Sequence, residues 1–271
     1  MKTFALLLLF AAPTYRCLAQ GEDPFGQSHP IQEEQAKNES ESAAFFGGEG
    51  PVNLKSLQGR PIKQLSLNAC DDLRSISPIV GLKLEDVMLW KIDVDDISPL
   101  AGMPIQKLVI FGCPVKDLTV LKGMPLKSLW IGATNVADFS PLKGLPLTDL
   151  SLYSSEVSDL SPLEGMPLES LNIQVVDPAK LSDLTPLKGM KLKELVFNAE
   201  TIIHGMEVIR AMKSLKEINR MPADEFWRKY ETVQLDRNKK EHGGAGQPAT
   251  RPEAKSEDSD KPQPESERRS R

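Results

Sequence analysis

The sequence predicts an α/β solenoid in which short parallel strands form a β-sheet on the concave face, short 3-10 or turn segments lie on the convex face, and a short C-terminal helix caps the array. The phrase L-x-G-M-P-L recurs with glycine spacings of 22, 21, 21, 21, 21 and 24 residues, a fixed period typical of stacked repeats. Each glycine precedes L-x-x-L-x-L, whose last two apolar positions alternate with polar ones, as in a strand buried on one face. The glycines are Gly59, Gly81, Gly102, Gly123, Gly144, Gly165 and Gly189.

A Ser-Pro or Thr-Pro step in most units predicts the convex turn. The hydroxyl is expected to cap one tight helical turn that the proline opens, and the glycine three residues later ends it. Two residues before this step stands an aspartate, which we expect to accept hydrogen bonds from backbone amides of its own turn rather than to form a ladder of cation sites. These aspartates are Asp96, Asp117, Asp138, Asp159 and Asp183.

The full unit, L-x-x-L-x-L-x-x-[NCT]-x-V-x-D-L-S-P-L, resembles the short bacterial leucine-rich repeat of the internalin type, over residues 51–220. The resemblance implies a leucine-rich-repeat solenoid. The internalins' grip on host receptors is only loosely implied, because this chain shows no immunoglobulin-like domain after the repeats, no helical cap of their type and no wall-sorting motif.

The N-terminal region divides into two predicted segments. Residues 1–19 have the charge, the apolar run and the small residues of a secretory signal peptide, so we expect an exported protein, periplasmic, in the cell envelope or secreted. Residues 20–50 carry seven acids against one base and predict an acidic disordered leader. An alternative is a short helix over residues 31–46 that covers the first coil. The array itself is expected to start on a half-coil at Asn53.

The C-terminal region is also predicted in two parts. Residues 221–230 have a proline near their start, acids in the first turn and bases in the last, which predicts a short capping helix over the last coil. Its Phe226, Trp227 and Tyr230 are expected to cover the core that the last coil exposes. Residues 231–271 hold nine acids and nine bases and predict a disordered polyampholyte tail without a membrane anchor.

Charge and reactive residues exclude several function classes. The net charge of −5 becomes −7 without Lys2 and Arg16 of the signal peptide, which disfavours nucleic-acid binding. Cys70 and Cys113 lie two coils apart, about 9.6 Å at ~4.8 Å per strand, so we expect two buried thiols and no disulfide. No catalytic, phosphate-binding or metal-binding motif occurs, so we expect neither an enzyme nor a cofactor.

The outward positions of the strands form the candidate site. In neighbouring coils they gather large apolar and aromatic side chains, and such exposed patches mark interaction surfaces. Gly132 is expected to leave a notch between two rings. The sequence predicts a protein or peptide partner; a carbohydrate ligand and a purely structural module remain alternatives, and the oligomeric state is open. The predicted ligand-binding residues are Met88, Trp90, Val109, Phe111, Trp130, Tyr153 and Asn172.

Overall fold

The computed structural model describes residues 42–48, 51–175, 177 and 180–242, with side chains as far as residue 233. The predicted signal peptide, most of the predicted leader and residues 243–271 of the predicted tail lie outside these residues. The chain divides into two compact units, Met1–Phe226 and Trp227–Arg271, and each is described by itself.

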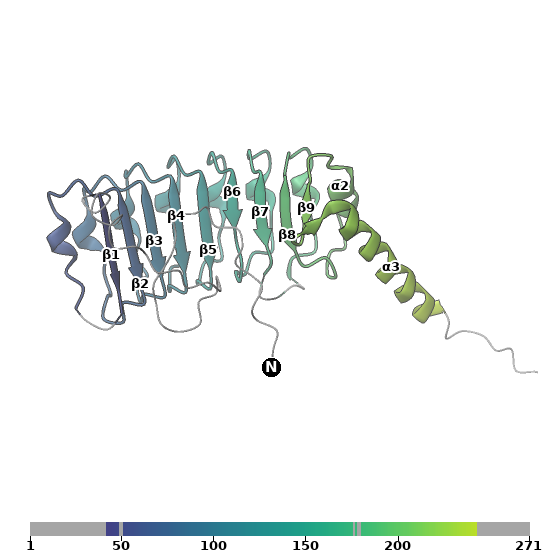
Figure 1. Cartoon of the computed structure of the whole chain (residues 1–271), viewed down its shortest axis with the longest axis horizontal. Coiled ribbons are helices and arrows are strands. Elements are labelled where there is room, and N and C mark those ends of the chain that lie inside the picture. Colours follow the sequence, from purple (N-terminus) through teal and green to yellow (C-terminus); the bar gives the residue numbers. More distant parts are fainter. Residues whose placement is uncertain (1–41, 49–50, 176, 178–179, 243–271) are drawn as a thin grey trace, which may run out of the picture. The chain divides into compact units, whose positions relative to one another are not determined.

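One ten-stranded sheet runs through the first unit with its strands in sequence order (Figure 1). Neighbouring strands are parallel except for the last pair, which is antiparallel. The predicted solenoid with a parallel sheet is therefore confirmed. The strands are β1 (Ala43–Gly47), β2 (Gln64–Asn68), β3 (Asp86–Trp90), β4 (Lys107–Phe111), β5 (Ser128–Gly132), β6 (Asp149–Ser151), β7 (Ser170–Ile173), β8 (Glu194–Phe197), β9 (Glu217–Ile218) and β10 (Met221–Pro222).

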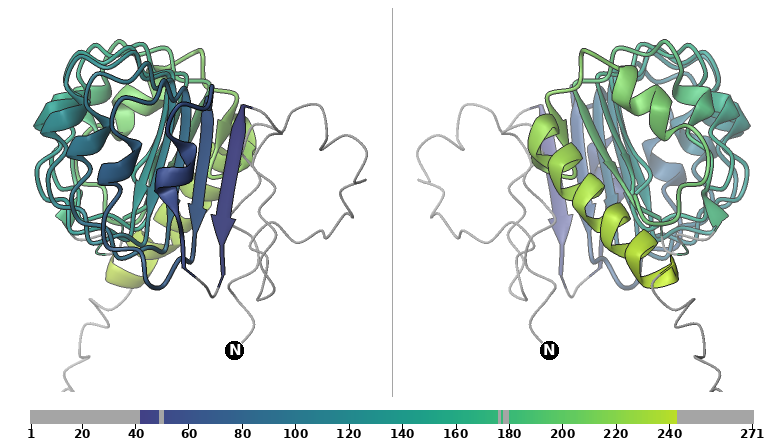
Figure 2. Two further views of the ribbon diagram at one scale, coloured as in Figure 1. Left: turned by 90° about the vertical axis from the view of Figure 1, so that its left-hand side faces the viewer. Right: turned by 90° about the vertical axis from the view of Figure 1, so that its right-hand side faces the viewer.

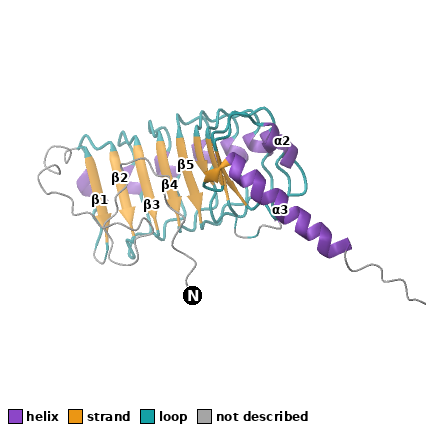
Figure 3. Cartoon of the chain, turned by 45° about the vertical axis from the view of Figure 1, so that its right-hand side comes forward, coloured by secondary structure: helices purple, strands orange, loops and turns teal. Residues whose placement is uncertain are grey.

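Short 3-10 helices lie behind the sheet, one per regular coil (Figures 2 and 3). Except for the first, which begins at Leu54, each begins at the serine or threonine of the Ser-Pro-like step, and the hydroxyl provides no cap. The aspartate caps instead: Asp138 Oδ1 accepts the Ser140 N–H at 2.8 Å, and the other four aspartates of this column do the same. The helices are η1 (Leu54–Leu57), η2 (Ser77–Ile79), η3 (Ser98–Leu100), η4 (Thr119–Leu121), η5 (Ser140–Leu142), η6 (Ser161–Leu163) and η8 (Thr185–Leu187).

The core lies between the sheet and these turns. Inward strand residues stack in register from coil to coil, as Leu89 pairs with Ile110 and Ile110 with Ile131. All three are at most 1% exposed. Cys70 and Cys113 are buried in the same layer, as predicted, and the Cys113 thiol donates to the Leu89 carbonyl at 3.4 Å. Each coil thus shields the apolar faces of its neighbours, which a single coil cannot do alone.

The start of the array differs from the prediction. Residues 43–47, expected within a disordered leader or a short helix, form β1, and Ala44 pairs with Leu65 one period later. The array therefore starts on a complete coil rather than a half-coil. The repeat is hidden here because Ala44 and Phe46 replace the usual leucines.

The end of the array also differs in its bounds. Met221–Pro222 forms β10, and the helix that follows, α3, is Ala223–His242 rather than residues 221–230. Residues 231–242, expected to be disordered, are helical. Phe226 is buried and packs on Phe197 of the last full coil with ring centroids 6.0 Å apart, as expected for a cap. The capping roles of Trp227 and Tyr230 remain predictions.

Two further features complete the last coil. The helix α2 (Met206–Ala211) replaces the usual 3-10 turn and buries Ile209 in the core. Asn219 and Arg220 connect β9 to β10 with φ values of 50° and 63°. Two positive φ angles in a row are those of a tight hairpin turn, which asparagine adopts at little cost.

Candidate functional site

Strand register places the predicted site residues on one face of the sheet. Met88, Val109 and Trp130 are opposite one another on β3, β4 and β5, and this column continues to Ser151 and Asn172. A second column on the same face holds Trp90, Phe111 and Gly132. Residues about 21 positions apart in sequence become neighbours because each coil adds one strand at ~4.8 Å.

Three aromatic rings form a stack along this second column, which we call the aromatic stack (Trp90, Phe111 and Tyr153). The rings of Trp90 and Phe111 are 4.4 Å apart with an interplanar angle of 19°. Tyr153 follows the end of β6, and its ring lies 6.4 Å from that of Phe111 at an angle of 7°. One ring face of Trp90 thus packs against one ring face of Phe111.

Burial on this face is greater than the sequence suggested. Met88 and Val109 were expected to be exposed, yet each is only 8% exposed. Side chains on adjacent strands cover one another at this spacing, and the Ser66 hydroxyl contacts the Met88 sulfur at 3.5 Å. The four aromatic residues of the predicted site, Trp90, Phe111, Trp130 and Tyr153, are half-buried rather than fully exposed.

Gly132 does not form the open notch that the sequence suggested. A Cβ atom at this position would lie 2.9 Å from Cε2 of Phe111 and 2.1 Å from the carbonyl oxygen of Tyr153. The Phe111 ring therefore fills the space above the glycine. The absent side chain allows the aromatic stack to close rather than admitting a ligand.

Amide side chains extend the face beyond the rings. Asn172 Oδ1 accepts the Gln174 N–H at 3.0 Å, which fixes the orientation of its carboxamide. Asn198 Oδ1 similarly accepts the Val175 N–H at 3.2 Å. The Gln174 Oε1 atom is buried and has no hydrogen-bond partner among the described residues. A buried acceptor left unpaired costs about 1 to 3 kcal/mol, and because this oxygen is inaccessible on the surface, it offers no direct contact to a ligand.

A third column on the same face carries carboxylates; Asp86 and Asp149 are expected there from the sequence as polar rim residues, whereas the sequence analysis missed Glu194 and Glu217. Glu194 and Glu217 are directly opposite each other on β8 and β9, and Asp149 lies in the same column on β6. Burial raises the pKa of Glu194, and the carboxylate of Glu217 raises it further. Burial likewise raises the pKa of Asp86 at the other end of the column. Extending the outward columns through the last two coils of the sequence would have located the two glutamates.

One basic residue approaches the stack from the end of the array. Arg220 follows β9 in the hairpin turn and is half-buried. Burial lowers the pKa of its guanidinium, while an electrostatic interaction with Tyr153 opposes this shift. The face therefore combines aromatic rings, amides, carboxylates and the basic residues Lys107 and Arg220.

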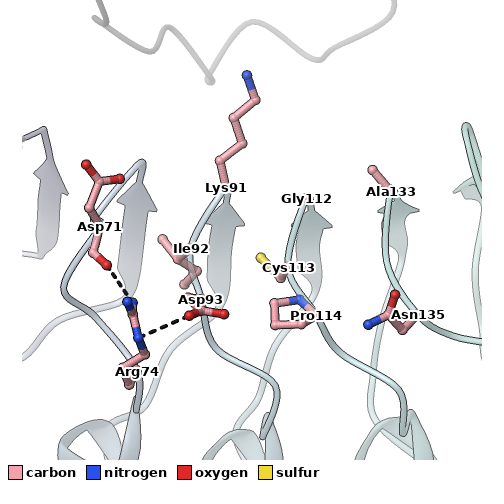
Figure 4. A pocket seen from close by; sticks show the side chains of 10 residues that line it. All are labelled: Asp71, Arg74, Lys91, Ile92, Asp93, Gly112, Cys113, Pro114, Ala133 and Asn135. Carbon is pink, nitrogen blue, oxygen red and sulfur yellow. Dashed lines mark hydrogen bonds and ion pairs between the residues drawn. The ribbon is translucent and has the colours of Figure 1, made fainter.

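A shallow groove at the C-terminal ends of β3, β4 and β5 is a weaker candidate (Figure 4). Arg74 lies between the Asp71 carbonyl oxygen and the Asp93 carboxylate, which it contacts at 3.0 Å, and Lys91 points away from them. Arg74 and Asp93 thus neutralise each other. Nothing in this arrangement activates a nucleophile or a proton donor.

Metal binding and membrane insertion find no support in the described part of the chain. There, no three histidine, cysteine, aspartate or glutamate side chains gather closely enough to hold a metal ion. Nor does any helix among these residues have the length and apolar character needed to cross a bilayer.

Coils of about 21 residues, each giving one parallel strand and one 3-10 turn, define a leucine-rich-repeat solenoid. No protein-family model matches the sequence, and no curated protein matches it. Among solved structures, the chain is similar to an internalin (inlF) from Listeria monocytogenes, with 23% identity over 62% of this chain and a TM-score of 0.45. The match spans 64% of that protein's chain. An internalin C2 (inlC2) from the same organism gives 20% identity, a TM-score of 0.41, and coverage of 62% of this chain and 83% of that one.

Proposed function

We propose that this protein is an exported, non-enzymatic binding protein that holds an extended protein or peptide segment against the sheet face that carries the aromatic stack. The single observation behind this proposal is the close association of Trp90, Phe111, Trp130 and Tyr153 with Asn172 on one face. Aromatic side chains in partly desolvated patches supply much of the energy of protein interfaces.

The polar groups favour a peptide over other ligands. An extended segment offers a regular series of N–H and C=O groups to the polar side chains of this face. Asn172 adds a carboxamide whose oxygen is already held by the Gln174 N–H, which directs its nitrogen to an incoming carbonyl group.

The geometry of the stack argues against the carbohydrate alternative. Sugars bind aromatic residues through the ring faces, and Trp90 and Phe111 each have one ring face covered by the other at 4.4 Å. The ring surface that remains suits apolar and aromatic side chains of a protein partner. The predicted signal peptide places such a partner outside the cytoplasm.

A peptide library displayed on phage and selected on the mature protein tests the proposal. For a selected peptide, Trp90→Ala combined with Trp130→Ala should weaken binding at least 30-fold, since hot-spot residues each contribute about 2 kcal/mol or more. The matched control is Val80→Ala, a 63% exposed residue outside the face, which should leave the dissociation constant unchanged. Circular dichroism verifies that both variants are folded.

Two results would contradict the proposal. One is retained peptide affinity in the folded Trp90 and Trp130 double variant. The other is that no peptide is selected, while the wild type binds a glycan on an array and the double variant does not. This result would favour the carbohydrate ligand instead.

A further inference from the structure

In the described part of the chain, the first strand of the sheet has one edge without a partner strand. β1 stands at the start of the ten-stranded order, and β2 is its partner on one side only among the residues that the structure describes (Figures 1 and 2). The backbone groups along an unpaired edge can pair with another strand.

The hydrogen bonds to β2 reveal which groups face outward. The Ser42 carbonyl accepts the Gln64 N–H at 3.0 Å, and the Gly48 N–H donates to the Asn68 carbonyl at 3.4 Å. Successive residues of a strand direct their backbone groups to opposite sides, so the even-numbered residues face β2. The N–H and C=O groups of Ala43, Phe45 and Gly47 therefore face away from the sheet.

Within the described residues, the strand itself carries none of the usual protection against pairing. Natural edge strands are blunted by lysine, proline, bulges or a covering element. The sequence of β1 is AAFFG, with no charge and no proline, and its pairing with β2 is regular over all five residues. Phe45 is the only large side chain on the outward face of this strand, and it is 72% exposed.

We propose that β1 pairs antiparallel with β1 of a second copy of this chain, about a two-fold axis at Phe45. The outward-facing residues are symmetric about this position, so Ala43 of one copy falls opposite Gly47 of the other. Each opposite pair exchanges two N–H···O=C bonds. A surface that is complementary to itself in this way produces a closed dimer, and the two sheets become one continuous sheet.

The side chains fit the same register. On the outward face, each Phe45 ring meets the small residues Ala43 and Gly47 of the second copy, which leaves room for two rings at the axis. The sheet already contains such a contact, because the Phe111 ring lies over Gly132 of the next strand. Pairing would partly cover the Phe45 ring, which is 72% exposed.

A second copy is a better match than a charged partner because β1 has no charge with which to select one. The dimer leaves the proposed peptide-binding face open, since the aromatic stack begins two strands away at β3. It would present two such faces side by side on one sheet, which strengthens binding to a repetitive or dimeric partner.

Sedimentation equilibrium and light scattering of the mature chain over a range of concentrations test the inference. The wild type should form a dimer at concentrations where Phe45→Pro, which removes an outward N–H, and Phe45→Lys, which adds an edge charge, remain monomeric. The matched control is Ile203→Lys, because Ile203 is 73% exposed but lies outside β1; this variant should dimerise like the wild type. Measurements at moderate and high salt are compared, since Glu41 and Glu49 flank the strand in the sequence and salt screens their charges.

Three outcomes would overturn the inference. The wild type could be monomeric at every concentration and salt level, or both Phe45 variants could remain dimeric while folded. The third outcome is loss of the dimer in Ile203→Lys, which would indicate association through another apolar surface. Circular dichroism of each variant separates these outcomes from unfolding, and none of them depends on whether a peptide binds the aromatic stack.

Discussion

Replacing Gly132 with alanine is a sharp test of how the candidate face is packed. The φ angle of Gly132 is not in the left-handed region, so an alanine backbone fits there. The cost is steric: the new Cβ would lie 2.1 Å from the Tyr153 carbonyl oxygen and 2.9 Å from the Phe111 ring. Because the closest atom belongs to the backbone, a change of side-chain rotamer cannot relieve the overlap.

The size of the effect follows from the cost of overpacking. Inserting a methyl group into a closely packed site typically costs about 1 to 3 kcal/mol. In a protein of this size each kcal/mol lowers Tm by about 2 to 4 °C, so Gly132→Ala should lower Tm by roughly 2 to 12 °C. The near-ultraviolet circular dichroism of Trp90 should also change, because Phe111 must move from its stacked position.

Thermal melting followed by far- and near-ultraviolet circular dichroism separates this effect from the general cost of losing a glycine. The matched control is Gly123→Ala, which has a φ of +77° and no atom within 4 Å of the added Cβ. Its cost is conformational, about 1 to 2 kcal/mol, and its near-ultraviolet spectrum should be that of the wild type. An unchanged Tm and spectrum in Gly132→Ala would refute the close packing of this face.

Three further predictions concern the turns, the thiols and the core. Hydrogen bonds from the following serine or threonine lower the pKa values of Asp96, Asp138, Asp159 and Asp183 below the ordinary 3.8. The stability that these hydrogen bonds supply is present above about pH 4 and is lost as the pH falls through the folded pKa values. In urea denaturation, an Asp138→Asn, Asp159→Asn double variant should therefore lose less stability in acid than the wild type. Burial raises the pKa of the Cys70 and Cys113 thiols, so a thiol reagent at neutral pH should modify them only after unfolding; rapid labelling of the native protein would contradict their buried placement. Leu89 is 0% exposed, so Leu89→Ala should lower the free energy of unfolding measured in urea by about 2 to 5 kcal/mol. Val80 is 63% exposed, so Val80→Ala should leave this free energy within about 0.5 kcal/mol of the wild-type value.

Much of the fold could be predicted from the sequence because the period of the repeat can be read directly from the spacing of its leucines and glycines. Leu129 and Ile131 recur in register in every regular coil, and an outward residue such as Trp130 lies between them, so the columns of the face follow from counting. The caps were harder to assign. The Ser140 hydroxyl was expected to cap the turn and does not, whereas the predicted hydrogen bond from the turn's N–H to Asp138 is confirmed.

The sequence by itself determined the solenoid, its parallel sheet and the residues that share the aromatic face, because a fixed period converts positions along the chain into positions in space. The tertiary structure decided how much of each side chain remains accessible, since burial depends on neighbours from other coils: Met88 and Val109 are covered, and Phe111 closes over Gly132. It also revealed β1, because Ala44 and Phe46 lack the repeat's leucines and their strand is recognised by its pairing with β2.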